Sequence, residues 1–313
     1  MSSYLVTGGA GFIGSHIVDE LVRRGERVRV LDNLSTGKRE NLAGVIEQIE
    51  FLEGDIRNLE TVRRAVEGMD YVLHQAALPS VPRSVADPLT SHEINVTGTL
   101  NILIAAREVN VKRVVYASSS SVYGNSPTLP KHEEMPTNPL SPYAVSKLAG
   151  ENYCHAFYKV YELPTVALRY FNVFGPRQDP QSQYAAVIPK FIAAMLRDDP
   201  PVIHGDGLQS RDFTYVSNVV EANLRVCQSA EIVGHVCNAA LGGRVSLLEL
   251  LAMLNGVLGA NIKAEFDAAR PGDVKYSQAD VSRLQGLTGF KQVVGFEEGL
   301  RRTVEWYSRS AQG

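Results

Sequence analysis

The stretch Thr7-Gly-Gly-Ala-Gly-Phe-Ile-Gly14 directly follows an apolar run, Tyr4–Thr7, and opens a segment with helical periodicity. Counted from Gly9, the glycines fit G-x-G-x-x-G, and counted from Gly8 they fit the related G-x-x-G-x-x-G. Such glycines permit a tight turn, let the backbone approach a pyrophosphate, and allow a helix to pack closely on a strand. The helix N-terminus adds oriented N–H groups. The stretch therefore predicts a strand, a phosphate-binding turn and a helix.

A carboxylate follows at the expected distance. Asp32 ends the second apolar run, 21 residues after Gly11. In this position a carboxylate accepts hydrogen bonds from an adenosine ribose and repels a 2′-phosphate, so the sequence favours NAD over NADP. Asp55, in Gly54-Asp-Ile-Arg57 after the third run, is placed to meet the adenine.

Outward from this motif, short β-branched runs alternate with amphipathic segments over about the first 170 residues. This alternation is typical of an α/β fold with a Rossmann-type, doubly wound parallel sheet. The expected strands are Tyr4–Thr7, Arg27–Leu31, Glu50–Glu53, Tyr71–His74, Arg113–Ala117 and Thr165–Arg169. The expected helices are Gly14–Arg24, Leu59–Glu67, Asn95–Asn110 and Tyr143–Tyr161.

The alternation fails after Arg169, where a Gly- and Pro-containing polar stretch predicts a boundary loop. We expect residues 1–172 to form the dinucleotide domain, with segments around 213–241 returning to it, and residues 173–313 to form a smaller α/β substrate domain. The elements expected there are helices Ala186–Arg197, Leu247–Leu258 and Phe296–Ser308, a helix opening near Ser217, and strands Val202–His204 and His235–Asn238.

The composition excludes several classes of protein. The 313 residues carry 31 Lys+Arg against 34 Asp+Glu, which gives no electrostatic reason to expect nucleic acid or an anionic membrane as partner. No apolar run approaches the roughly 20 residues that span a bilayer, and the N-terminus lacks a secretory pattern, so we expect a cytoplasmic protein. Cys154, Cys227 and Cys237 are too scattered for a disulfide or zinc framework, and we expect no metal site.

A possible proton-transfer pair lies in Tyr143-Ala-Val-Ser-Lys147. Its phenol and ammonium are four residues apart and so share one helical face. A nearby cation stabilises a phenolate and lowers the pKa of the phenol. The run Tyr116-Ala-Ser-Ser-Ser-Ser-Val-Tyr-Gly124, earlier in the chain, places hydroxyls at the carboxyl end of the fifth strand, where they face the cofactor crevice.

In this order, the glycine motif, the strand-end serines and Tyr-x-x-x-Lys resemble the extended short-chain dehydrogenase/reductase family, and within it the nucleotide-sugar 4-epimerases. The resemblance implies that Tyr143 is the general base, that Ser119 hydrogen-bonds the sugar O4, and that Lys147 holds the nicotinamide ribose. It further implies NAD contacts at Gly8, Gly11, Phe12, Ile13, Gly14, Asp32, Asn33, Asp55, Ile56, Ala76, Ala77, Asn95, Ser118, Tyr143, Lys147 and Tyr170.

The resemblance also implies an anchor for a UDP-sugar, because arginine forks bind phosphate oxygens. Arg211 and Arg270 fit the family's pyrophosphate clamps, Asn172 a phosphate contact, and Asp273 a ribose acceptor. The full set of implied substrate contacts is Ser80, Ser119, Ser120, Ser121, Tyr143, Asn172, Val187, His204, Arg211, Arg270, Asp273 and Ser277.

Residues beside Ser119 bear on the reaction. Family dehydratases and decarboxylases carry an acid near this position, whereas this chain has Ser120 and Ser121. Loss of a hydroxyl without an acid is difficult, so epimerisation at C4 is favoured over dehydration.

The sugar is the least determined feature. Ser277 falls where enzymes restricted to unacetylated hexoses carry a Tyr, so we expect room for a 2-acetamido group and action on UDP-N-acetylhexosamines, with UDP-glucose and UDP-galactose as further substrates. A UDP-uronic acid 4-epimerase, with Arg83 or Arg177 meeting the carboxylate, stays open, as does a non-catalytic NAD-binding regulator. The resemblance also implies a homodimer joined by a four-helix bundle from Asn95–Asn110 and Tyr143–Tyr161.

Overall fold

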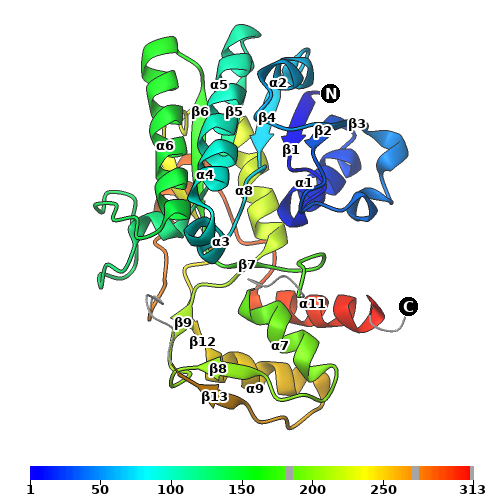
Figure 1. Ribbon diagram of the computed structural model, residues 1–313, viewed down its shortest axis with the longest axis vertical. Helices are drawn as coiled ribbons and strands as arrows, with labels where there is room; N and C mark the ends of the chain where they lie inside the picture. The colour runs from blue at the N-terminus through cyan, green and yellow to red at the C-terminus, as the bar shows by residue number, and fades with distance from the viewer. Residues whose placement is uncertain (181–185, 269–274, 311–313) are drawn as a thin grey trace.

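A seven-stranded parallel sheet forms the centre of the computed structural model, which describes residues 1–180, 186–268 and 275–310 (Figure 1). The strand order is β11-β6-β5-β4-β1-β2-β3, and all neighbours run parallel. The expected doubly wound α/β fold is confirmed. The strands are β1 (Ser3–Thr7), β2 (Arg27–Asp32), β3 (Glu50–Glu53), β4 (Tyr71–His74), β5 (Arg113–Ser119), β6 (Thr165–Tyr170) and β11 (Val236–Ala239).

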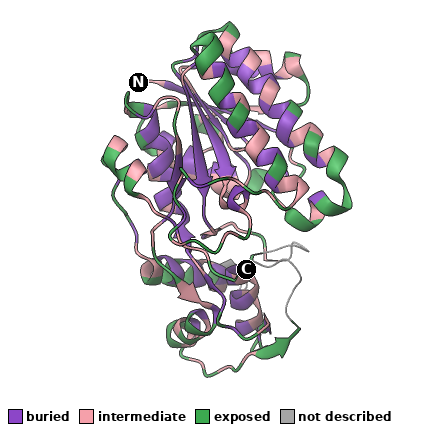
Figure 2. Cartoon of the chain, turned by 90° about the vertical axis from the view of Figure 1, so that its left-hand side faces the viewer, coloured by how far each residue is buried: buried purple, intermediate pink, exposed green. Residues whose placement is uncertain are grey.

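Successive side chains of a strand point to opposite faces of the sheet, and both faces are covered by helices. In β1, Tyr4 and Val6 enter one apolar cluster, whereas Leu5 enters the cluster on the other face. The central strands are accordingly buried along their length (Figure 2). The first face is covered by α1 (Phe12–Arg23), α8 (Val216–Gln228) and α10 (Ser282–Thr288), the second by α2 (Leu59–Val66), α5 (Gly98–Glu108) and α6 (Pro142–Tyr161).

The helical stretch expected over Asn95–Asn110 differs in the structure. Helix begins earlier, because Asp87 caps α4 (Pro88–His92) by accepting from the Thr90 N–H, and it continues through a π-helical turn, η3 (Glu93–Thr97), into α5. It ends before Asn110, whose φ of 55° lies in the left-handed region and breaks the helix. The remaining short turns of this half are α3 (Val81–Ala86), η1 (Arg39–Leu42), η2 (Ile46–Gln48) and η4 (Ser120–Tyr123).

A smaller lobe lies below the carboxyl ends of the strands (Figure 1). Its apolar core joins Phe191 of α7, Leu250 of α9 and Leu300 of α11. Ser246 and Glu249 form a capping box where α9 begins. The helices are α7 (Val187–Met195), α9 (Leu247–Leu258) and α11 (Phe296–Ser310), and the short strands are β7 (Val173–Phe174), β8 (Val202–His204), β9 (Ser210–Arg211), β10 (Thr214–Tyr215), β12 (Val245–Ser246) and β13 (Glu265–Asp267).

The chain crosses between the lobes more than once. After the smaller lobe begins, α8 packs on α1 and β11 pairs with β6. The chain returns again at α10, an element that the sequence did not predict, whose Leu284 enters the same apolar cluster as α1 and α8. Each lobe is therefore built from separate stretches of sequence.

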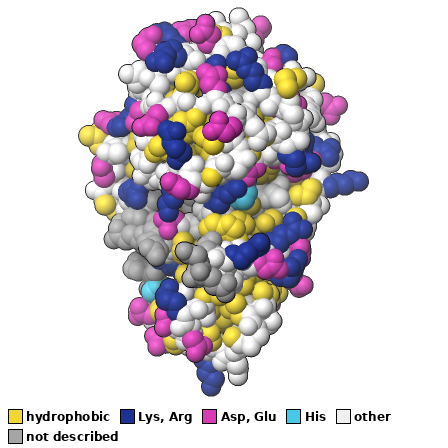
Figure 3. All heavy atoms as spheres, turned by 90° about the vertical axis from the view of Figure 1, so that its right-hand side faces the viewer, with side chains coloured by type: hydrophobic (Ala, Val, Ile, Leu, Met, Phe, Trp, Pro, Cys, Tyr) yellow, Lys and Arg dark blue, Asp and Glu magenta, His cyan; other side chains and the backbone are white. Residues whose placement is uncertain are grey.

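The surface bears mixed charge. Lys and Arg side chains alternate with Asp and Glu over the face seen in Figure 3, as the near-neutral composition implies. Among the described residues, no helix combines the length and the apolar character needed to cross a membrane.

Candidate active site

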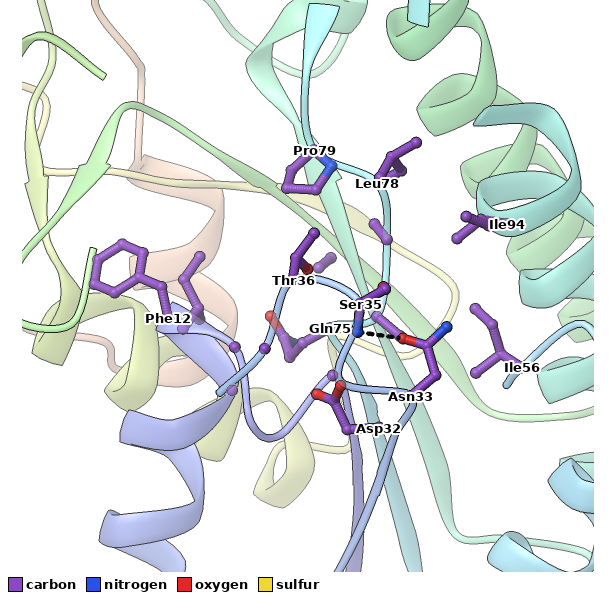
Figure 4. A pocket seen from close by; sticks show the side chains of 18 of the residues that line it. Phe12, Asp32, Asn33, Ser35, Thr36, Ile56, Gln75, Leu78, Pro79 and Ile94 are labelled. Carbon is purple, nitrogen blue, oxygen red and sulfur yellow. Dashed lines mark hydrogen bonds between the residues drawn. The ribbon is translucent and has the colours of Figure 1, made fainter. Parts of the chain in front are cut away.

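A cavity of about 430 Å³ opens where the sheet order reverses between β1 and β4, at the carboxyl ends of the strands (Figure 4). This is the position at which doubly wound sheets bind ligands. All of the predicted cofactor contacts except Asn95 line it. The lining also includes residues that the sequence analysis did not assign to the cofactor, namely Leu31, Ser35, Thr36, Gly37, Lys38, Asn41, Gly54, Gln75, Leu78, Pro79, Ile94, Ala117, Val173, Arg177, Gln178, Asp179 and Ala186.

The glycine turn forms one wall of the cavity. Gly8 has a φ of +68°, and its carbonyl oxygen accepts a hydrogen bond from the Gly11 N–H at 3.1 Å. A Cβ on Gly14 would lie 2.1 Å from that carbonyl oxygen, so only glycine lets α1 start this close to β1. The first N–H groups of α1 have no acceptor within the helix, and Phe12 and Ile13 line the cavity. The turn is thus suited to a pyrophosphate.

The carboxylate at the end of β2 is held by the backbone. Asp32 accepts hydrogen bonds from the Ala10 N–H at 2.9 Å and the Leu34 N–H at 2.8 Å. Burial raises its pKa, and these two donors oppose that shift. A Cβ on Gly37 would lie 2.9 Å from the carboxylate, so the next turn also approaches closely. The carboxylate is therefore fixed in a position suited to a ribose.

The neighbouring turn after β2 supplies further polar groups. The Asn33 side-chain oxygen accepts from the Ser35 N–H at 3.1 Å (Figure 4), and its amide donates to Asp55 at 2.9 Å. Hydrogen bonds from Arg57 lower the pKa of Asp55 to about 2, so Asp55 is ionised at neutral pH. The polar run from Ser35 to Lys38, which begins three residues after Asp32, is a sequence signal that could have identified this part of the wall.

Three hydrogen-bonded side chains join the cavity wall to α8. Tyr170, at the end of β6, donates to the Gln75 side-chain oxygen at 3.0 Å and accepts from the Asn223 amide at 2.8 Å. Asn223 lies on α8, which returns from the smaller lobe. Gln75 and Tyr170 both line the cavity. A contact between segments so distant in the chain leaves no local pattern in the sequence.

The predicted catalytic pair begins α6. Tyr143 is the second residue of this helix, and its backbone N–H donates to the Ser84 hydroxyl at 3.0 Å. The Lys147 ammonium lies 5.9 Å from the centroid of the Tyr143 ring and donates to the Ala117 carbonyl oxygen at 2.8 Å. Both side chains line the cavity. The structure therefore brings phenol and ammonium to one wall of the site.

Burial dominates the electrostatics of this pair. Burial raises the pKa of Tyr143, and a hydrogen bond with Ser119 acts in the opposite direction. Burial lowers the pKa of Lys147 to about 7, while the carboxylate of Glu151 opposes that shift. The hydrogen bond from Ser119 is thus one means by which the protein favours the phenolate.

Glu151 was not predicted from the sequence, although it lies one helical turn beyond Lys147. Its carboxylate pairs with Arg169 through hydrogen bonds of 2.8 and 2.7 Å and accepts from the Ser118 hydroxyl at 2.5 Å. Both members of the ion pair are at most 5% exposed. The pair supports the cavity from behind, because Ser118 is part of the cavity wall.

Asn95, a predicted cofactor contact, lies outside the cavity lining. It is buried on the π-helical turn. Its side-chain oxygen accepts from the Leu78 N–H at 2.7 Å, and its amide donates to the Ser146 hydroxyl at 3.0 Å. Asn95 thus holds the backbone of Leu78, which lines the cavity.

The predicted substrate residues other than Tyr143 lie outside the cavity lining. The Ser119 hydroxyl accepts from the Ser121 N–H at 3.2 Å, at the start of the turn that also holds Ser120. Ser80 caps α3 by accepting from the Arg83 N–H at 3.1 Å.

The remaining predicted substrate residues come from several elements of the smaller lobe and its boundary. Asn172, Arg211 and Ser277 are linked around β9, since the Ser277 N–H donates to the Ser210 carbonyl oxygen at 3.0 Å and the Asn172 side chain donates to the Asp212 carbonyl oxygen at 3.1 Å. Val187 begins α7, whereas His204 lies on β8, 3.5 Å from Asp267 of β13. Arg270 and Asp273 lie outside the described residues.

Comparison with known proteins decides the family. The family described as "NAD dependent epimerase/dehydratase family" matches residues 4–240. This chain belongs to the NAD-dependent epimerase/dehydratase family. The expected relationship to the extended short-chain dehydrogenase/reductase family is confirmed, and NAD is the cofactor.

Three relatives of this epimerase/dehydratase chain are informative. A putative UDP-glucose 4-epimerase of Methanocaldococcus jannaschii is 40% identical, over 96% of this chain and 97% of its own length. A UDP-N-acetylglucosamine 4-epimerase of Methanobrevibacter ruminantium, solved with UDP-N-acetylmuramic acid, is 45% identical with a TM-score of 0.95, covering 99% of both chains. A UDP-glucuronic acid 4-epimerase of Bacillus cereus, solved with NAD and a substrate analogue, is 31% identical with a TM-score of 0.91, covering 98% of this chain and 99% of its own.

The cavity fits the cofactor of this epimerase/dehydratase family. The glycine turn and the first turn of α1 would hold the pyrophosphate, and Asp32 the adenosine ribose. Tyr143 and Lys147 then line the part of the wall where we expect the nicotinamide ribose.

Proposed function

We propose that this protein inverts C4 of UDP-N-acetylhexosamines, interconverting UDP-N-acetylglucosamine and UDP-N-acetylgalactosamine. The observation that carries the proposal is the position of Tyr143 and Lys147 on the wall of the dinucleotide cavity. The family and the names of the relatives support a UDP-sugar 4-epimerase as the reaction class. The choice of an acetylated sugar is the finer part of the proposal.

Tyr143 acts as the general base that removes the proton from the sugar O4. Ser119 hydrogen-bonds the phenol, and Lys147 in its protonated form adds positive charge near the phenol ring; both stabilise the phenolate. NAD, when bound, supplies the acceptor for the C4 hydride and gives the hydride back. Tyr143 returns its proton to O4 after the sugar has turned its other face to the cofactor, so the chain ends the cycle unchanged.

A small side chain at residue 277 supports the acetylated substrate. Ser277 occupies the position at which the resembling unacetylated-hexose enzymes carry Tyr, and its backbone is held by Ser210 of β9. Removing the bulk of an aromatic ring leaves space for a 2-acetamido group. This interpretation is supported by the 45% identity between this chain and a UDP-N-acetylglucosamine 4-epimerase.

A substrate panel tests the proposal. The purified protein is incubated, without added oxidant, with UDP-N-acetylglucosamine, UDP-glucose and UDP-glucuronic acid, and the products are separated by chromatography. The Ser277→Tyr variant should lose turnover of the acetylated sugar by about tenfold or more, because the ring fills its space, and keep turnover of UDP-glucose. An equal loss on both sugars would contradict the assignment of Ser277.

Action on a UDP-uronic acid is the second candidate. It is favoured by the relative that acts on UDP-glucuronic acid and by Arg83, which lies on α3 beside Ser84, the residue that holds the Tyr143 backbone. Arg177 is less suited to the sugar carboxylate, because it already pairs with Asp19 at 2.7 Å. Turnover confined to the uronic acid in the panel would select this candidate.

We further propose a homodimer in which α5 and α6 of two copies form a four-helix bundle. Apolar side chains are exposed on this side of the molecule, among them Val145 on α6 at 52% and Leu89 on α4 at 67%. Light scattering coupled to size-exclusion chromatography should give twice the chain mass of 34.2 kDa. A Val145→Glu variant should shift the mass toward the monomer, whereas a monomeric unmodified protein would refute the dimer.

A further inference from the structure

Asp212 is a buried carboxylate that the proposed reaction does not use. It has no exposed surface, although it follows Arg211, a predicted substrate contact. Its carboxylate accepts hydrogen bonds from three backbone N–H groups, those of Leu241 at 3.2 Å, Gly242 at 3.0 Å and Ala279 at 3.1 Å. A buried charge is costly unless such donors replace water, so these bonds fix the surrounding backbone tightly.

The three N–H groups come from two distant segments. Leu241 and Gly242 follow β11, the edge strand of the central sheet. Ala279 belongs to the segment that contains Ser277 and pairs with Lys131 in an isolated bridge. One carboxylate thus joins the end of the central sheet to the segment that we assign to the sugar pocket.

The backbone of the same residue completes the junction. The Asp212 carbonyl oxygen accepts from the Asn172 side chain at 3.1 Å. On the N-terminal side, β9 comprises only two residues, Ser210 and Arg211, and its pairing with the equally short β12 contributes little to holding its position. Asn172, Arg211 and Ser277, three predicted substrate contacts from three separate segments, are therefore linked through residue 212.

We propose that Asp212 is a positioning residue that holds Asn172, Arg211 and Ser277 in one arrangement and so determines the affinity for the nucleotide sugar rather than the rate of the chemical step. The proposal rests on the proposed function, because it takes these three residues as substrate contacts. Asp212 itself touches no substrate in it; the residue acts through the backbone that it holds.

The Asp212→Asn variant tests this role. An amide keeps the shape of the carboxylate but has a single acceptor oxygen, so its NH₂ group faces at least one of the three N–H donors whichever way it turns. We expect KM for UDP-N-acetylglucosamine and the dissociation constant of UDP, measured by calorimetry, to rise about tenfold. The turnover number and the content of bound NAD should stay within about twofold, because Asp212 lies outside the cofactor cavity.

Asn218→Ala is the matched control. The Asn218 side chain is also buried and also joins distant backbone, accepting from the Val293 and Val294 N–H groups and donating to the Val294 carbonyl oxygen. It holds none of the three predicted contacts. A purely structural role for Asp212 would lower the thermal stability of both variants and leave KM and UDP affinity unchanged in both, which would overturn the proposal.

Hydrogen exchange on the unmodified protein provides a test that needs no variant. Adding UDP should slow exchange at residues 241–242 and 279 together with that at Arg211, because one carboxylate connects them. Protection at Arg211 without protection at 241–242 and 279 would refute the role of Asp212. Absence of protection everywhere would instead show that UDP does not bind, which refutes the proposed function.

Discussion

At the scale of single residues, the site is governed by how burial and neighbouring groups set proton affinity. Tyr143 and Lys147 are both shifted toward their neutral forms by burial, the first upward and the second downward in pKa. The phenolate needed for proton removal must therefore be stabilised by nearby groups. Ser119 and the buried Lys147 side chain are the groups that the structure places there.

The Ser119→Ala variant should move the pH dependence of the reaction. The hydrogen bond from Ser119 lowers the pKa of Tyr143, so its loss raises that pKa, and the acid limb of turnover shifts to higher pH. A hydrogen bond to a charged group contributes about 1.5–3 kcal/mol, which is large enough for the displacement of the acid limb to be resolved in a pH profile. The measurement is the turnover number from about pH 5 to 10.

Ser141→Ala is the control for this prediction. Ser141 caps α6 by accepting from the Ala144 N–H, close to Tyr143 but without contact to its phenol. Its loss should lower stability by about 1 kcal/mol and leave the acid limb in place. If both variants moved the limb equally, the effect would come from the helix and not from the hydroxyl.

At the scale of elements, α1 can begin close to β1 because the glycines of the turn carry no side chain. Gly14 touches the Gly8 carbonyl oxygen so closely that any Cβ would push the helix away from β1. The N–H groups of the first turn would then move away from the pyrophosphate. The local sequence determines this element almost completely, and so it was predicted well.

Gly14→Ala should therefore weaken NAD binding by more than about tenfold, with a loss of stability of roughly 1–3 kcal/mol from overpacking. The NAD content of the purified protein, measured by absorbance after denaturation, reports the change. Gly256→Ala, inside α9, is the control, because a Cβ there meets nothing within 4 Å and the helix gains propensity. Full NAD content in Gly14→Ala would contradict the assigned contact.

Elements held by distant partners were harder to predict. The parallel strands up to β6 were found from their apolar runs, whereas β13 is exposed along its length and carries no such run. Helix α10 is only seven residues long, and only its Leu284 is fully buried. In the site, the glycine turn, Asp32 and the Tyr143 pair follow local motifs, but Gln75, Asn223 and Glu151 gain their roles from contacts across the sheet that no local spacing encodes.

At the scale of the whole molecule, residues of both lobes line the cavity. Its wall combines the strand ends of the central sheet with Val173, Arg177 and Ala186 from the other side of the lobe boundary. A ligand that fills this cavity therefore joins the lobes. The cofactor should contribute to the stability of the molecule as well as to its chemistry.

Removal of NAD should lower the melting temperature. A ligand at 100 times its dissociation constant stabilises the folded state by about 2.7 kcal/mol, which corresponds to a rise of roughly 5 °C for a protein of this size. Scanning calorimetry of the stripped protein, with and without added NAD, measures the difference. NADP provides the comparison, and equal stabilisation by both would contradict the assignment of Asp32 to the ribose.

Strand β11 lies far along the chain from its partner β6, and this order has a consequence for folding during translation. During translation, β6 remains an unpaired sheet edge until residues 236–239 leave the ribosome, and the apolar side of α1 stays uncovered until α8 follows β10. An unpaired parallel edge is prone to association with other chains. A chain that stops near residue 172 would therefore expose both this edge and the apolar side of α1, although it already contains Ser119, Tyr143 and Lys147.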